Sequence, residues 1–465
     1  MKELTKYNFE VKTDFIEITT LASIFGLLIL GNSGLIISFT IIVFFMLKKR
    51  EWLVKGVLYA LFVRFANPVL FPLDGSLTII FSWSIVLISF VKSLKLFYRE
   101  RIKIDKFILF LVTFVCYVLI VSAIKSPYWM VSLFKIIGFS IGFFSIYFSL
   151  SLTMEYNWEN FIFNVALFFI IVSTPLFFFK SIGMARNGWS FQGITNHPQA
   201  YGVFLSILLS FITVSLFSNS NIKKTKSLFW TGIISVGFFH LFMTHARTGI
   251  FSLFLSFMVV FLLFLIGKGK LRNNSFFKRM FSERGIFLVL LVILAFLINY
   301  STIISEIKEM AYKEVTKVRI DSYKESGFEK IVLSRKGLVI NSLNNFYQEP
   351  LTGIGFGIPS NRGYADINTF VDVPISASIE KGNLFIALLE ETGLIGLFLF
   401  ILFIGAVFLK IIKSTNVGFM VLFLTAFLCN MGEMVFFSTN GSGTLIWFAL
   451  LMPFFRIKYL VGLND

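Results

Sequence analysis

The sequence predicts an all-α polytopic membrane protein with about 14 transmembrane helices (12–14) and one large, partly helical extracytoplasmic loop. Two features of the composition and one of the pattern support this. Hydrophobic residues make up 57% of the 465 residues, and charged residues only 14%, against roughly 25% in an ordinary soluble domain. Apolar runs of about 20 residues, enough for a helix to cross a bilayer, recur along the chain. A soluble enzyme, a disordered chain and a secreted disulfide scaffold are excluded.

Fourteen candidate spans begin near residues 18, 34, 52, 76, 107, 128, 160, 198, 228, 247, 285, 384, 416 and 443. The first two share a run of only 30 residues, which Gly31-Asn32-Ser33-Gly34 divides, so without that division the count is thirteen. The spans predict helices 1–11 within residues 1–301, a large outer loop at 302–382, and helices 12–14 within 383–465. The mixed charges at the N-terminus do not fit a cleavable signal peptide, so we expect the spans themselves to direct insertion.

Positive charge predicts the orientation of the spans. With the N-terminus inside, 26 Lys and Arg residues fall on cytoplasmic segments, whereas the short outer loops hold only Lys125, Lys180, Arg186 and Arg247. Cytoplasmic loops are enriched in Lys and Arg, so both termini are predicted to be cytoplasmic. The net charge of +17 is therefore a topology signal and not a surface for nucleic acid.

The single long connection, residues 302–382, is predicted to fold on the outer face. Its ten basic and ten acidic residues balance. Apolar residues at helical spacing predict one helix from Ile304 to Val318 and a second from Phe328 to Phe346. Arg335 falls within the apolar stripe of the second helix, and a glycine-rich turn follows at residues 353–357.

The ionisable and polar residues in or beside the spans gather on the predicted outer side. Burying such groups in lipid is costly, so the few that occur are informative. Arginine presents a planar fork of donors that pairs with phosphate oxygens, and the group therefore suits a polyanion. Structural alternatives are interfacial snorkelling for Arg186, helix capping for His197, and hydrogen-bonded packing for His240. The candidate residues are Arg186, Asn196, His197, His245, Arg247, Arg335 and Glu380.

Four short motifs occur in order between residues 186 and 400. They are GITNHP at 193–198, HARTG at 245–249, Ser334-Arg335 followed by PLTGIGFG at 350–357, and GNLFIALLEETGLIG at 382–396. The last resembles the H-N-x-x-L-x-x-L-x-E-x-G-L-I-G segment of the O-antigen ligase and O-antigen polymerase (Wzy-type) superfamily. The others resemble that superfamily's G-x-x-x-N-P/H region, its S-R-T-G motif and its R…P-L-x-G-x-G-x-G element.

The resemblance implies glycosyl transfer at the outer face of the bacterial cytoplasmic membrane, with no metal, cofactor or nucleotide sugar. Donor and acceptor would be glycans on undecaprenyl pyrophosphate. The implied partners are membrane lipid, a chain-length regulator and a flippase. Ligases of the superfamily carry a His where this chain has Gly382, which cannot transfer a proton. Polymerases vary more there, so the substitution favours a polymerase of repeat units for O-antigen, capsule or exopolysaccharide.

The expected mechanism assigns roles to these side chains. Arg335, Arg247 and Arg186 hold the pyrophosphate and stabilise the negative charge that develops as the sugar–phosphate bond breaks. Glu380 accepts the proton of the acceptor hydroxyl. The remaining substrate-binding residues in this hypothesis are Asn196, His197, His245 and Asn383.

Other functions remain open at this point. A ligase or a protein O-glycosyltransferase would use the same donor; deleting the gene for a polymerase leaves single repeat units attached, whereas deleting that for a ligase leaves none. A transporter, such as a flippase of lipid-linked glycans, would explain Arg64 and Lys135 within predicted spans, although the hydropathy shows no internal repeat. Alternatively, these two cations pair with a buried acid such as Glu433. A non-catalytic scaffold is disfavoured by the outer arginines.

Overall fold

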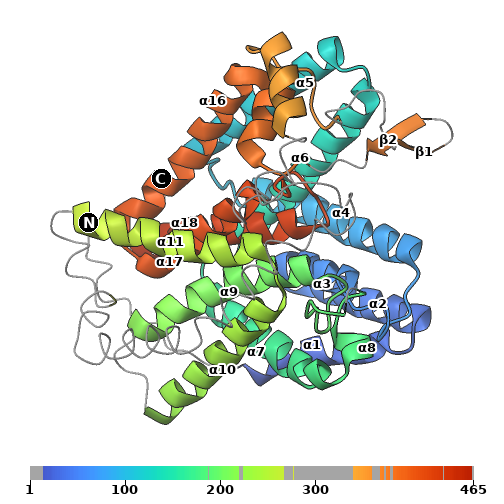
Figure 1. Ribbon diagram of the computed structural model, residues 1–465, viewed down its shortest axis with the longest axis vertical. Helices are drawn as coiled ribbons and strands as arrows, with labels where there is room; N and C mark the ends of the chain where they lie inside the picture. Colours follow the sequence, from blue (N-terminus) through green and yellow to red (C-terminus); the bar gives the residue numbers. More distant parts are fainter. Residues whose placement is uncertain are drawn as a thin grey trace, which may run out of the picture.

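The computed structural model describes residues 14–186, 188–218, 224–266, 276, 339–358, 367–370, 373–377, 381–432 and 434–462. These parts of the chain are mainly helical (Figure 1). Each candidate span within them is occupied by a helix. The span near residue 285 and the first loop helix, Ile304–Val318, lie outside the described residues.

The elements from α1 to α11 follow one another with short connections. In the first half they are α1 (Phe15–Leu28), α2 (Asn32–Lys48), α3 (Trp52–Arg64), α4 (Gly75–Arg99), α5 (Lys106–Lys125), α6 (Trp129–Ser151), α7 (Trp158–Ser173), the 3₁₀ segment η2 (Thr174–Phe178) and α8 (Lys180–Gly183). The later elements are α9 (Pro198–Ser218), α10 (Lys224–Met243), α11 (Arg247–Ile266), β1 (Ile367–Phe370), β2 (Val373–Ala377), α16 (Leu384–Lys413), α17 (Val417–Leu428), the 3₁₀ segment η4 (Cys429–Met431) and α18 (Ser442–Val461).

Eight helices in the described chain are long and apolar enough to cross a membrane: α4, α5, α6, α7 with η2, α9, α11, α16 and α18. Further apolar helices, among them α1, α2 and α17 with η4, are shorter. The 14 residues of α1 rise about 21 Å, less than the roughly 30 Å of a hydrocarbon core. The chain is a multi-pass membrane protein, but the count of fourteen full spans is not established.

The large loop contains a hairpin that the all-α prediction omitted. Strands β1 and β2 pair antiparallel, with Ile367 opposite Ala377 and Phe370 opposite Val373. The hairpin projects from the side of the helical body (Figure 1). Residues 339–348, also within this loop, are helical and agree with the second predicted loop helix from residue 339 onward.

Two helices, α3 and α17, stop short, and irregular backbone continues after each. α3 ends at Arg64 after 13 residues, and Asn67, three residues later, is fully buried. The Asn67 side chain donates to the carbonyl oxygens of Ile182 at 2.9 Å and Gly193 at 3.0 Å. α17 ends after 12 residues, and residues 432–441 lead to the start of α18. Irregular backbone at membrane depth needs such protein partners, because lipid offers none.

Buried ion pairs join the helices at one end of the bundle. This is the end predicted to be cytoplasmic, and we call it the inner end; α1, α3, α5 and α7 begin there and α18 finishes there. The pairs are Arg456–Glu159 and Lys458–Asp105, each with a nitrogen–oxygen distance of 2.9 Å, and Lys55–Glu17.

The Glu17 carboxylate has further partners at the inner end. The Tyr59 hydroxyl donates to its Oε2 at 2.9 Å, and the Tyr156 hydroxyl donates to its Oε1 at 2.8 Å. Burial and the nearby charge of Glu17 raise the pKa of Tyr156, which therefore stays a protonated donor. The inner end is thus tied together by satisfied charges, which is a structural role.

In Figure 1, α5, α6 and α16 lie toward one extreme of the long axis and α1, α7, α8 and α10 toward the other, with α18 between them. Aromatic rings fill the contact of α18 with α6. The ring centroid of Trp447 lies 5.5 Å from that of Phe139 and 6.1 Å from that of Phe143. Dispersion contacts of this kind hold membrane helices together, because lipid tails are as apolar as the helix surfaces.

Candidate outer-face site

The predicted site residues His245 and Arg247 lie in the tight turn between α10 and α11. We call this end of the bundle, opposite the inner ion pairs, the outer end. Arg247 is the first residue of α11 and is half-buried. His245 has a φ of 54°, and its N–H donates to the carbonyl oxygen of Phe242 at 3.0 Å. The turn places the Arg247 guanidinium at a helix start, where the backbone adds a partial positive charge.

α9 and α11 approach each other closely near this turn. A Cβ atom on Gly249 would lie 2.8 Å from the carbonyl oxygen of Gly202, and a Cβ on Gly202 would lie 2.2 Å from the Cβ of Ala246. Small residues permit such an approach between membrane helices. The crossing brings the first half of α9, which follows His197, against the turn that holds Arg247.

Arg186 lies in the loop before α9. The N–H of Ala185 donates to the carbonyl oxygen of Ser190 at 2.8 Å, which closes a tight turn with Arg186 exposed near its tip. At the base of this turn the N–H of Phe191 donates to the carbonyl oxygen of Met243 at 2.8 Å. The loop of Arg186 is therefore attached to the end of α10, next to the turn of Arg247.

Asn196 connects the same loop to the end of α3. Its backbone N–H donates to the carbonyl oxygen of Phe65 at 2.7 Å, and its side-chain amide donates to that of Arg64 at 3.3 Å. The His197 Nδ1 atom accepts a hydrogen bond from the N–H of Gln199 at 3.2 Å, which is the capping contact considered from the sequence. The end of α3, which carries the half-buried Arg64, is thus joined to this loop through backbone carbonyl groups.

Asn383 caps the start of α16. Its side-chain oxygen accepts from the N–H groups of Phe385 at 2.9 Å and Ile386 at 3.3 Å. Its side-chain amide donates to the carbonyl oxygen of Met431 at 3.1 Å. These contacts give Asn383 a positioning role for the segment that contains Gly382, and its predicted contact with substrate stays a prediction.

The segment after η4 links the start of α16 to α11. The N–H of Met434 donates to the carbonyl oxygen of Lys381 at 3.2 Å. A Cβ on Gly432 would lie 2.2 Å from the Thr248 Oγ1, so this segment packs directly against the residue after Arg247. Three of the four motifs therefore meet at the outer end: those before α9, α11 and α16.

The fourth motif, PLTGIGFG at 350–357, forms backbone hydrogen bonds with α16 at a break in that helix. Gly393 has a φ of 65° and interrupts the helix. The N–H of Ile354 donates to the carbonyl oxygen of Glu390 at 2.9 Å, and the N–H of Leu394 donates back to the carbonyl oxygen of the motif's proline at 2.9 Å. The backbone groups freed by the break are satisfied by the motif.

The glycines of both motifs are required by this close contact. A Cβ on Gly353 would lie 2.5 Å from the backbone carbon of Glu391, and a Cβ on Gly393 would lie 2.3 Å from that of Leu351. Both glycines have positive φ, which other residues rarely adopt. Backbone packing thus explains why this chain has glycine at these two positions of the motifs.

A buried charged group, which we call the Lys381 cluster, lies at the outer end of α16. It consists of Lys381, Glu390, Glu391, Lys135 and Asn345. The Lys381 ammonium lies 3.0 Å from Glu390 Oε2 and 2.9 Å from Glu391 Oε1, and the side-chain exposures are 2% for the lysine and 0% for both acids. Asn345 donates to Glu390 Oε1 at 2.7 Å.

Lys135 reaches this cluster from α6. It interacts electrostatically with Glu391 and Lys381, and its ammonium lies 5.2 Å from the centre of the Phe356 ring. A Cβ on Gly357 would lie 2.5 Å from the Lys135 Cδ. The acid near Lys135 is therefore Glu391, and not Glu433, which we named from the sequence.

Sequence reasoning missed the Lys381 cluster, although a signal was present. Glu390 and Glu391 are adjacent acids inside an apolar run that begins at Leu384. Carboxylates in a span require a cation or donor nearby, so they predict partners even where the partners cannot be named. Only the fold identifies these partners as Lys381 and Lys135.

Arg335 and Glu380, which carry the most direct chemical roles in the sequence hypothesis, lie outside the described residues. So does Glu433, the other acid considered for pairing. The described neighbours of Arg335 and Glu380 along the chain are helical residues 339–348 and the buried Lys381. The roles predicted for Arg335 and Glu380 stay predictions.

The outer end is chemically suited to an anion. α9, α11, α16 and α18 all begin there, and helix starts present unpaired N–H groups with partial positive charge. Arg64, Arg186 and Arg247 lie on the loops and helix ends around them. Within the described parts of the chain, no group of three His, Cys, Asp or Glu side chains is placed to hold a metal ion.

Comparison with known proteins identifies one related family. Residues 231–401 match the family model described as O-Antigen ligase. The matched range contains the HARTG, PLTGIGFG and GNLFIALLEETGLIG motifs. No curated protein matches the chain significantly.

Proposed function

We propose that this protein polymerises lipid-linked glycans. The match of residues 231–401 to the O-Antigen ligase family model supports membership of the O-antigen polymerase and ligase superfamily. The family supports a membrane glycan enzyme. The finer proposal is a polymerase that joins undecaprenyl-pyrophosphate-linked repeat units of a surface polysaccharide. The reaction takes place at the outer face of the bacterial cytoplasmic membrane, and the chain has both termini in the cytoplasm.

The observation that supports this proposal most is the meeting of three motifs around Arg247. Arg247 is the first residue of α11; its neighbour Ala246 packs against Gly202 of α9, and its neighbour Thr248 packs against Gly432 of the segment after η4. A diphosphate placed there gains from the fixed charge of Arg247 and from the N–H groups of the helix starts. Arg64 and Arg186 lie on loops joined to the same region.

In the proposed reaction an acceptor hydroxyl oxygen attacks the anomeric carbon of the donor glycan. The bond between that carbon and the phosphate oxygen breaks, and its electron pair leaves with the pyrophosphate, where Arg335, Arg247 and Arg186 stabilise the added charge. Glu380 takes the hydroxyl proton. Attack from the side opposite the phosphate inverts the anomeric centre.

Gly382 supports a polymerase over a ligase in this proposal. The residue lies directly before the cap Asn383, at the position where ligases of the superfamily carry a histidine. A ligase is the second candidate function, because the matching family model is described as O-Antigen ligase. Arg64 and Lys135, which favoured a transporter, have contacts with the outer loop and with the Lys381 cluster.

The test uses the purified full chain in detergent with a lipid-linked repeat unit and follows the products on a gel. A ladder of lipid-linked oligomers is expected. Transfer only to an acceptor without the polyprenyl carrier would support the ligase instead, and no transfer at all would overturn the proposal.

Variants of Arg247 test the site. Arg247→Ala should reduce ladder formation about 10²–10³-fold, the usual cost of removing one donor to a developing anion. Arg247→Lys should retain part of the activity, because it keeps the charge but loses the planar fork. Arg99→Ala, at an exposed arginine of the inner end, is the control and should have no effect. An undiminished ladder from Arg247→Ala would remove Arg247 from the mechanism, and the same result for Arg335→Lys would remove Arg335.

A further inference from the structure

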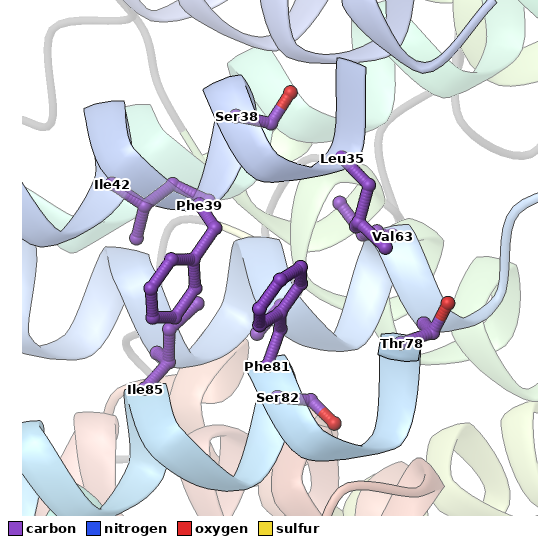
Figure 2. A pocket seen from close by; sticks show the side chains of 10 residues that line it. Leu35, Ser38, Phe39, Ile42, Val63, Thr78, Phe81, Ser82 and Ile85 are labelled. Atoms are coloured by element: carbon purple, nitrogen blue, oxygen red, sulfur yellow. The ribbon is translucent and has the colours of Figure 1, made fainter. Parts of the chain in front are cut away.

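Several buried hydroxyls of the bundle bond along their own helix. Figure 2 shows two of them on α4, Thr78 and Ser82. Their hydroxyls donate to the carbonyl oxygens of Asp74 at 2.7 Å and Ile79 at 3.0 Å. Such bonds satisfy the hydroxyl but join no element to another. The imidazole of His240, in the last turn of α10, is different, because both of its nitrogens bond to side chains of other elements.

His240 lies where α7, α9 and α10 contact one another (Figure 1). Its side chain is buried, with an exposed fraction of 1%. The Nδ1 atom lies 3.1 Å from the hydroxyl of Tyr201 in α9. The Nε2 atom lies 3.4 Å from the Oγ1 of Thr174, the first residue after α7. The histidine therefore links the outer ends of three helices.

The direction of these hydrogen bonds follows from Thr174. Its hydroxyl donates to the carbonyl oxygen of Ile170 at 2.7 Å, so its oxygen can only accept from the imidazole. The proton of the neutral ring then lies on Nε2, and Nδ1 accepts from the Tyr201 hydroxyl. Every donor in this group has an acceptor, and a fully satisfied buried network favours a single geometry.

The same group supports the loop before α9. The ring of Phe191, a fully buried residue of this loop, has its centroid 4.8 Å from that of His240. Ser173, which hydrogen-bonds the Tyr201 side chain, accepts from the N–H of Ile194 at 3.3 Å. His240 thus contacts the loop directly through a ring and indirectly through the side chains of Tyr201 and Ser173.

Close contacts hold the loop at the same point. Gly193 has a φ of 56°, and a Cβ there would lie 2.5 Å from the Ser173 Oγ. The Gly193 carbonyl oxygen accepts from the side chain of Asn67 at 3.0 Å. The GITNHP motif therefore begins at a tightly held position of the backbone, with Arg186 before it in the chain and Asn196 after it.

The chemistry of His240 indicates more than the filling of space. Phenylalanine would pack against the Phe191 ring without a polar nitrogen, and burying a polar group is costly unless its hydrogen bonds are made. The imidazole adds orientation, because bonds to two different elements fix the plane of the ring. The ring plane in turn determines the surface against which Phe191 packs.

We propose that His240 is a positioning residue of the outer-face site, which holds the loop before α9 so that Arg186 and Asn196 reach the lipid-linked substrate. The histidine is buried and acts through the loop, not on the reacting atoms. The proposal rests on the proposed function, because that function assigns substrate contacts to this loop. Loss of the His240 hydrogen bonds should therefore weaken substrate binding.

Hydrogen exchange of the full-length protein in detergent tests the hold on the loop without any substrate. In His240→Phe and in Tyr201→Phe, the peptide with Phe191 and Ile194 should exchange about 5–150-fold faster than in the unaltered protein. This factor corresponds to the cost of about 1–3 kcal/mol for leaving a buried polar group without its partner. Unchanged exchange of this peptide in both variants would overturn the proposal.

Tyr147→Phe is the matched control for Tyr201→Phe. Both tyrosines are fully buried, and the Tyr147 hydroxyl also bonds to one side chain, donating to Asp105 at 3.0 Å. Asp105 belongs to the ion pairs of the inner end. The same substitution there should leave both the exchange of the loop peptide and the KM for substrate unchanged.

The ladder assay separates positioning from a loss of folding. A variant that merely unfolds more has fewer active molecules, so its apparent kcat falls while KM for the lipid-linked repeat unit stays the same. His240→Phe and Tyr201→Phe should instead raise KM, again by about 5–150-fold. His240→Gln, which keeps one donor and one acceptor, should raise KM less than His240→Phe.

The outcomes distinguish this role of His240 from the proposed function. An unchanged KM in folded His240→Phe and Tyr201→Phe overturns the positioning role and leaves the polymerase standing. No ladder from the unaltered protein overturns the polymerase, while the exchange of the loop peptide still decides whether His240 holds the loop.

Discussion

Replacing Lys381 by Met tests whether the Lys381 cluster holds the outer end of α16 in place. The ammonium of Lys381 lies within 3.0 Å of one oxygen of Glu390 and of Glu391, and neither acid is exposed. Methionine has a similar length and volume but no charge. After the change, Lys135 is the cation that remains near the two buried carboxylates within the described chain, and Asn345 still donates to Glu390.

The expected loss of folding stability follows from the burial of these two ion pairs. Removing one partner of a buried ion pair costs about 3–5 kcal/mol, because the remaining charge stays in a medium that solvates it poorly. At roughly 2–4 °C per kcal/mol for domains of 150–250 residues, the melting temperature should fall by about 6–20 °C. The Ile354 contact of Glu390 should loosen with it, and ladder formation should fall.

Thermal unfolding in one detergent, followed by tryptophan fluorescence, measures the effect. The matched control is the triple variant Lys381→Met, Glu390→Gln, Glu391→Gln, in which no charge of the trio remains. It should recover most of the lost stability, because neutral replacement of a whole buried charged group often costs little. A single variant that melts at the wild-type temperature, or a triple variant no more stable than the single one, would refute the reasoning.

Two further variants test the contact of PLTGIGFG with the break in α16, and the assignment of a structural role to the inner end and of substrate binding to the outer end. Gly393→Ala puts a Cβ 2.3 Å from the backbone of Leu351 at a φ of 65°, so it should lower the melting temperature and the ladder yield, at a strain cost of at least about 1–3 kcal/mol. Gly405→Ala on the same helix, where a Cβ meets nothing within 4 Å, should not lower the melting temperature of the protein. Equal melting temperatures of the two variants would contradict the tight contact between Gly393 and Leu351. Arg456→Met removes the buried partner of Glu159 at the inner end and should lower the melting temperature by a comparable amount to Lys381→Met while leaving KM for the lipid-linked substrate unchanged. A raised KM in that variant would argue against a site confined to the outer end.

Local pattern was enough to predict the class of protein and the position of its helices. An apolar run dictates a helix in lipid because every backbone group must find its partner within the segment. Each candidate span in the described residues is therefore helical. Arg247 and Asn383 stand at helix starts, and their predicted contact with substrate stays a prediction. The lengths of α3 and α17 were less predictable, because their early ends depend on protein partners such as Asn67.

By itself, then, the sequence determined a helical membrane protein and showed a resemblance to the O-antigen polymerase and ligase superfamily. Only the tertiary structure decided that Lys381 pairs with Glu390 and Glu391, and that PLTGIGFG satisfies the broken backbone of α16. The physical reason is distance along the chain. A helix is determined by neighbours within four residues, whereas a buried charge is stabilised by whichever opposite charge the fold brings within about 3 Å, and that partner has no fixed spacing in sequence.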